Sequence, residues 1–114
     1  MNFEQLTLNF DLLTPDVFGN IDILDIVVRI EQRFNILLAR EDSWDCRKRY
    51  VYRKGKKLFE VYKGSFGAHT YNGVSYVHVG FEDSKNLSGS ASPCKDWDEV
   101  FKEVERVLAQ MGVK

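Results

Sequence analysis

The sequence predicts one α+β domain spanning residues 1–114, in which an antiparallel sheet carries two helices on one face. Three observations predict this class: apolar residues at helical spacing in two segments, alternation of apolar and polar residues in others, and turn signals between them. The expected order is strand, helix, a possible short strand, a three-stranded meander and a final helix. The sheet would then hold the meander plus one or two extra strands. A chain of this length buries enough surface for a core without metal or disulfide support.

A strand and a long apolar helix are expected first. Residues 6–12 alternate apolar with polar side chains, which is typical of a half-buried strand. A helix is expected within 17–34, with Thr14 and Pro15 suited to its start and Gly19-Asn20 able to break or restart it. Its apolar residues fill two adjacent stripes, more than one buried face needs. We therefore expect this helix to be buried on more than one side or to supply an oligomer face.

A hairpin and a further strand are expected in the middle of the chain. Residues 35–40 are a plausible edge strand, and the hairpin strands lie near 46–53 and 57–63, joined by a turn at Lys54-Gly55. Residues 74–82 form the clearest strand, with alternate residues on opposite faces. The next segment is rich in Ser, Gly and Asn and is expected to be a loop, residues 84–93.

The last helix has the strongest signals. Asp96 is placed to cap it, Glu99 completes a capping box, and Gly112 is placed to end it. Between them runs an unbroken apolar stripe at helical spacing, which predicts that one face packs on the sheet. The members of this stripe are Trp97, Val100, Phe101, Val104, Val107, Leu108 and Met111.

The charge is strongly segregated. The formal net charge is −1, yet residues 47–63 hold eight Lys or Arg against a single acid, Glu60. The chain is therefore dipolar rather than basic, which argues against general affinity for polyanions.

The hairpin provides the candidate binding residues. Alternation places either its arginines or Tyr50 and Tyr52 away from the helices. If the arginines point away, the open face presents arginine for phosphate and aromatic rings for stacking on unpaired bases. The same basic residues are typical of a solvated strand edge, and runs of charge are more often solvated faces than binding sites. The candidate anion or nucleic-acid site comprises Arg47, Arg49, Arg53, Tyr62, Tyr76 and His78.

No catalytic or metal-binding motif is recognisable, so we expect neither an enzyme nor a cofactor. The pairs formed by Cys46, His69, His78 and Cys94 lack the close spacing of zinc sites. His69 lies in a glycine-flanked loop and is the loop candidate for a small-molecule pocket between the sheet and the last helix. Cys94 is expected to be inert, because acidic residues follow it.

The expected function is binding. No apolar run is long enough to span a bilayer and no secretory signal is evident, so a cytoplasmic protein without membrane contact is expected. The first hypothesis is a small interaction or accessory protein that binds another protein, or itself as a homodimer, through the apolar helix 17–34. The alternative is binding of single-stranded nucleic acid or another anion through the hairpin 47–63.

Overall fold

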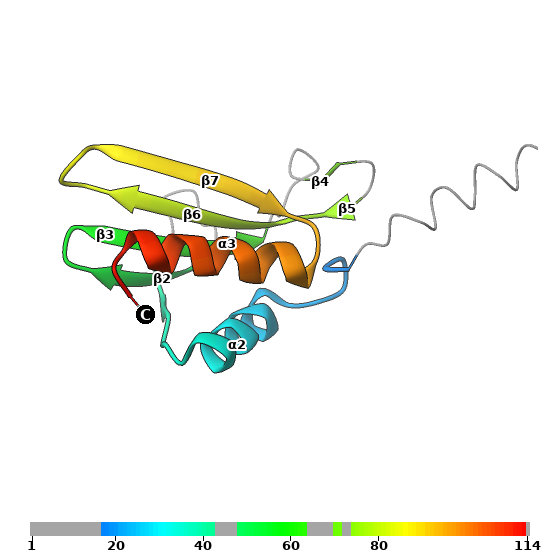
Figure 1. Cartoon of the computed structure of the whole chain (residues 1–114). Helices are drawn as coiled ribbons and strands as arrows, with labels where there is room; N and C mark the ends of the chain where they lie inside the picture. Colours follow the sequence, from blue (N-terminus) through cyan, green and yellow to red (C-terminus); the bar gives the residue numbers. More distant parts are fainter. Residues whose placement is uncertain (1–16, 43–47, 64–69, 72–73, 114) are drawn as a thin grey trace, which may run out of the picture.

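The computed structural model describes residues 17–42, 48–63, 70–71 and 74–113, and it confirms the predicted α+β class. Five antiparallel strands form one sheet in the order β1-β2-β3-β6-β7, and the two helices lie together on one side of it (Figure 1). These elements are β1 (Ala39–Arg40), β2 (Arg49–Lys54), β3 (Lys57–Lys63), β6 (Val77–Asp83), β7 (Ser88–Cys94), α2 (Ile23–Phe34) and α3 (Trp97–Gln110). Two short strands, β4 (Thr70–Tyr71) and β5 (Val74–Ser75), pair separately. The strand expected at 6–12 lies outside the described residues.

Helix α2 begins later than the sequence pattern suggests. Residues 17–20 form a turn, and the helix starts at Ile23, where the Asp22 carboxylate accepts a hydrogen bond of 3.1 Å from the Leu24 N–H. Gly19-Asn20 therefore belongs to the turn rather than to the helix. The helix ends at Asn35, whose φ of 55° is a left-handed conformation that asparagine tolerates.

The hairpin and the edge strand form near their predicted places, but the turn lies at Gly55-Lys56, one residue later than the predicted Lys54-Gly55, because Lys54 still pairs with Lys57. β2 and β3 pair from Arg49–Tyr62 to Lys54–Lys57, around a two-residue turn in which Gly55 has a φ of 62°. The short strand expected within 35–40 is β1, which pairs antiparallel with β2.

The prediction of a loop at 84–93 is wrong over most of that range. Only its first four residues form a turn, and β7 then pairs with β6 from Asp83–Ser88 to Val77–Cys94. The strand has a polar, glycine-containing sequence because it is a sheet edge that needs a partner on one side only. The Asp83 carboxylate closes the turn by accepting hydrogen bonds from Lys85 N–H (3.1 Å) and the Asn86 side chain (2.7 Å).

The core lies between the sheet and both helices. The cap predicted at Asp96 and the end predicted at Gly112 are confirmed, because the Asp96 carboxylate accepts from Glu99 N–H at 2.9 Å and Gly112 follows the helix with a φ of 77°. Apolar residues of the strands and of both helices form one buried cluster, as the alternation in the strands and the helical spacing in the helices predict. The completely buried side chains are Phe18, Ile26, Val27, Ile30, Phe59, Val61, Val77, Val79, Val100, Val104 and Val107. Neither described helix combines the length and apolar character needed to cross a membrane.

Candidate functional site

The hairpin arginines lie on the sheet face opposite the helices. Tyr50 and Tyr52 face the other way, Tyr50 within the core and Tyr52 packed against it. Arg49 is directly opposite Tyr62 on β3, and Tyr62 is opposite His78 on β6. Of the two orientations that alternation allows, the structure therefore has the one with arginines away from the helices.

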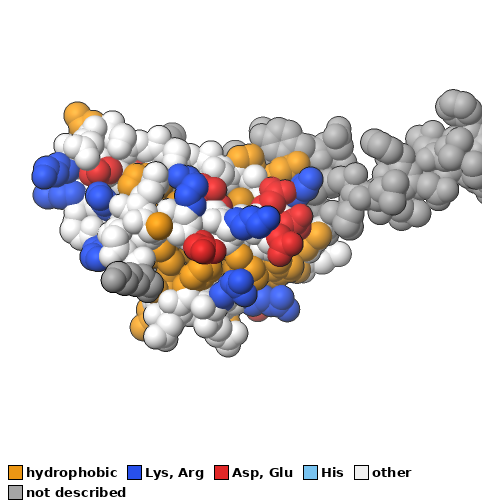
Figure 2. All heavy atoms as spheres, in the orientation of Figure 1, with side chains coloured by type: hydrophobic (Ala, Val, Ile, Leu, Met, Phe, Trp, Pro, Cys, Tyr) orange, Lys and Arg blue, Asp and Glu red, His pale blue; other side chains and the backbone are white. Residues whose placement is uncertain are grey.

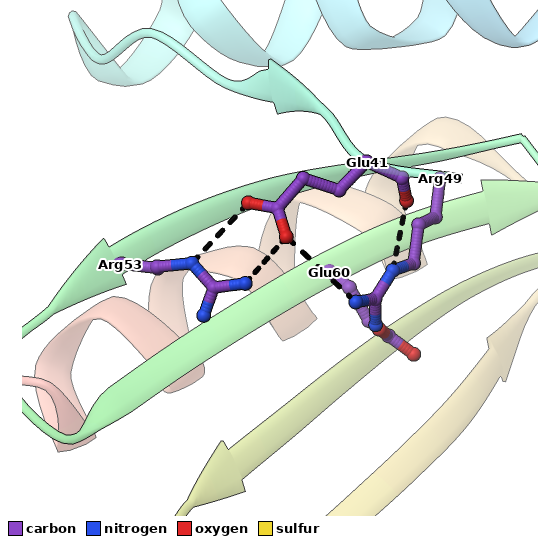
Figure 3. A network of polar contacts seen from close by, with 4 residues as sticks. All are labelled: Glu41, Arg49, Arg53 and Glu60. Atoms are coloured by element: carbon purple, nitrogen blue, oxygen red, sulfur yellow. Dashed lines mark hydrogen bonds and ion pairs between the residues drawn. The ribbon is translucent and has the colours of Figure 1, made fainter. Parts of the chain in front are cut away.

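These arginines are engaged with carboxylates of the same chain (Figure 3). Arg49 forms an ion pair with Glu60 and donates through Nε to the backbone oxygen of Glu41 at 2.9 Å. Arg53 donates through Nε to the Glu41 carboxylate at 3.2 Å and forms an ion pair with it. The hydrogen bond from Arg53 lowers the pKa of Glu41 below its usual value. These ion pairs neutralise the positive charge of the two arginines, which the sequence analysis predicts to bind an anionic ligand.

The aromatic part of the predicted site is buried rather than presented to solvent. Tyr62 and His78 stack on one another with centroids 4.9 Å apart and planes at 10°, and their exposed fractions are 9% and 8%. A base could not stack on the faces that these rings turn toward each other. Tyr76 is half-buried just before β6. Arg47 and His69 lie outside the described residues.

The hairpin lysines bind backbone carbonyl groups. Lys54 Nζ donates to the Gly112 oxygen at 2.9 Å, and Lys57 Nζ donates to the Gln110 oxygen at 3.1 Å. The last turn of α3 contains no basic residue, so the hairpin supplies the positive charge that stabilises a helix C-terminus. Lys63 makes the same kind of contact with two carbonyl groups that precede α2. Much of the basic cluster therefore has a structural role.

Helix α2 carries apolar side chains on a face that the fold leaves open. Its buried face points at the sheet, while Leu24 and Val28 on the opposite side are 51% and 38% exposed. Leu37, just beyond the helix, is 82% exposed. Val28, Leu37 and Tyr52 line an open groove of about 790 Å³ that runs between α2 and the start of the sheet. The two apolar stripes read from the sequence are thus one buried face and one exposed face.

Two arginines border this face on the side of α3. Arg29 lies over the Trp97 ring at 4.5 Å from its centroid, and Arg33 lies over Phe101 at 4.6 Å. Among the described residues neither arginine forms an ion pair, and neither does the exposed Asp25 one turn earlier. Figure 2 shows the hydrophobic band between α3 and α2 with basic side chains along its lower border. The sequence contained these residues, but only the packing of α2 beside α3 brings them together.

The Cys94 thiol is buried and not activated as a nucleophile. Burial raises the pKa of the Cys94 thiol to about 12, with smaller contributions from nearby Glu103 and Glu99, so the thiol is protonated at neutral pH. Within the described ranges no group of three or more His, Cys, Asp or Glu could hold a metal ion.

Comparison of the chain with models of protein families, with curated proteins and with solved structures gave no match. Its function is therefore inferred from the surfaces described above.

Proposed function

We propose that the chain is a protein-interaction module whose binding surface is the exposed face of α2. The observation that carries the proposal is the exposure of Leu24 and Val28 on a helix whose other face is fully buried. A contiguous apolar patch of this kind is typical of docking sites, whereas single exposed apolar residues are ordinary. Leu37 and the groove beside it extend the patch beyond the helix. The surface offers apolar contacts at its centre and charged side chains at its border, as interfaces commonly do.

Site-specific crosslinking tests the proposal. A photoreactive residue at Val28, in cells that naturally produce the chain, should give a discrete crosslinked species, because an interaction surface is occupied there. The same residue at Gln110, exposed at the end of α3, is the matched control. The crosslinked protein is then purified, and its affinity should fall at least about tenfold with Leu24→Glu, since a buried carboxylate replaces an apolar contact. Equal crosslinking at both positions would contradict the proposal.

Anion binding by the hairpin 47–63 has less support. Arg49 and Arg53 do share a sheet face with Tyr62 and His78, but the arginines are paired with Glu60 and Glu41. A phosphate would have to displace these carboxylates. Fluorescence anisotropy with labelled single-stranded oligonucleotides at low salt decides the matter. Binding that is lost when both arginines become Ala would revive this function.

A further inference from the structure

We propose that the occupant of the α2 face is a second copy of the chain, packed antiparallel across a two-fold axis. This rests on the proposed function, because it takes the α2 face as an interaction surface and assigns its partner. A two-fold interface uses the same patch on both copies, so the patch must be complementary to itself when its direction is reversed. The charges and the apolar residues of α2 both meet this requirement.

The charges along one border of the face change sign at its midpoint. Asp25 lies toward the N-terminus of α2, and Arg29 and Arg33 lie toward its C-terminus, all of them exposed. Asp25 and Arg29 are four residues apart, a spacing at which opposite charges on one helix attract each other. They form no ion pair here, because the Arg29 guanidinium lies over the Trp97 ring instead. The acid and the arginine are therefore both available to a partner.

An antiparallel two-fold pairing matches these charges. The axis reverses the order of residues along the helix but keeps each border of the face beside the same border of the second copy. Asp25 then lies beside Arg29 of the second copy, and Arg29 lies beside Asp25 of the second copy. A parallel two-fold pairing would instead bring this border against the opposite border of the second copy, so Asp25 and Arg29 would not face each other.

The apolar residues match in the same orientation. Val28 lies near the middle of the exposed face, within one residue of the level at which the axis crosses the helix, and therefore lies close to its own copy. Leu24 lies toward the N-terminal end, while the groove runs along the C-terminal half of α2, where Val28 and Gln32 line it, and reaches Leu37 beyond the helix. Reversal of direction places Leu24 of each copy toward the groove of the other. A binding surface for an unrelated partner would not need one end of the patch to fit the other end in this way.

Sedimentation equilibrium of the full chain, from micromolar to millimolar concentration, tests the pairing. We expect a reversible monomer–dimer equilibrium whose dissociation constant rises at least about tenfold in Leu24→Glu and in Val28→Glu. Leu87→Glu is the matched control, because Leu87 is 92% exposed on the turn between β6 and β7. A strictly monomeric wild type would overturn the proposal, as would equal weakening by the control.

A charge exchange tests the orientation. Asp25→Arg and Arg29→Asp should each raise the dissociation constant about tenfold, and the double variant should restore most of the loss, because opposite charges again face each other. Lys102→Asp makes the same change of charge on the exposed side of α3 and should have little effect. Thermal unfolding of each variant separates a lost interface from a lost fold. Single effects that simply add in the double variant would overturn the antiparallel arrangement.

The two proposals fail in different ways. A monomeric chain that crosslinks through position 28 to another protein, with loss on Leu24→Glu, would keep the proposed function and overturn self-pairing. A monomeric chain with no specific crosslink would overturn both. A dimer broken by substitutions on the α2 face would support both.

Discussion

Helices α2 and α3 pack on the same side of one sheet, but they use their apolar residues differently. In α3 the large apolar side chains are buried or half-buried in one stripe. In α2 the buried face is equally complete, yet Leu24 and Val28 remain exposed on the other side. Both helices are strongly amphipathic, so the difference is one of surplus apolar area. A surplus on a helix that already has a full core face points to a contact outside the chain.

The position of each helix explains the difference. Helix α3 contacts β6 and β7, and α2 contacts β3 nearer the start of the sheet. The two helices touch through Phe34 and Phe101, whose ring centroids are 6.2 Å apart. The far side of α2 meets no other described element. One layer of helices covers the sheet but leaves the outer face of α2 open (Figure 1).

The largest predicted effect is a difference in thiol reactivity between the two regions. In a Cys46→Ser background, Cys94 should react with a thiol reagent at pH 8 at least about a hundredfold more slowly than a cysteine introduced by Leu24→Cys. The buried thiol has a pKa of about 12, and an exposed thiol has one near ~8.5, so far less of Cys94 is thiolate. The absorbance of the coloured thiolate that the reagent releases measures both rates. Similar rates would mean that Cys94 is not buried.

The ratio of the two reaction rates should change with pH in one direction. Because its pKa is raised, the folded Cys94 thiol keeps gaining thiolate as the pH rises toward about 12. The introduced thiol at position 24 is already ionised above pH ~9, so its rate levels off there. The ratio of the two rates should therefore shrink as the pH rises. A ratio that is constant between neutral and alkaline pH would contradict the assigned pKa.

The next effect is on stability, measured with a matched pair of leucines. Leu108→Ala on α3 should lower the free energy of unfolding by about 2–4 kcal/mol, because Leu108 is buried and its removal leaves a cavity. Leu24→Ala on α2 should change it by less than about 0.5 kcal/mol in the monomer. Urea unfolding at low protein concentration measures both. A large loss from Leu24→Ala under those conditions would show that this leucine supports the fold rather than an interface.

Much of this comparison could be predicted from the sequence. The cap at Asp96, the stripe that follows and Gly112 define α3 correctly because all three are local signals. The surplus of apolar residues in α2 was also visible, but which stripe stays exposed depends on how the helix meets the sheet. That is a tertiary property.

Strand β7 and the hairpin arginines show what local patterns miss. Ser88–Cys94 has low strand propensity and becomes a strand because β6 offers it a complete row of hydrogen-bonding groups. Arg49 and Arg53 are close to Glu41 only because β1 pairs with β2, so acid and arginines 8 and 12 residues apart share one end of the sheet. A count of charge within 47–63 could not include a carboxylate from outside that range.

The two helix caps should contribute similarly to the free energy of unfolding, unlike the apolar residues of the two helices. Asp22→Ala and Asp96→Ala each remove a side-chain acceptor from a backbone N–H at the first turn, at 3.1 Å and 2.9 Å respectively. Each should cost about 1 kcal/mol of unfolding free energy, measured by urea titration. Asp→Asn at the same positions is the control, since asparagine also caps. A much smaller loss at Asp22 would indicate that α2 is held by tertiary packing alone.

The smallest predicted effect concerns the contact between the two helices. Arg29 over Trp97 should contribute about 0.5–1 kcal/mol, because the guanidinium is exposed and only partly desolvated. A double-mutant cycle with Arg29→Gln and Trp97→Leu isolates this coupling from the larger packing loss at Trp97. The cycle should be run at concentrations where the chain is monomeric. A coupling near zero would mean that Arg29 is not held over the ring in solution and is free to bend back toward Asp25. The charge exchange proposed for the dimer would then lose its premise, because the acid and the arginine could neutralise each other within one helix.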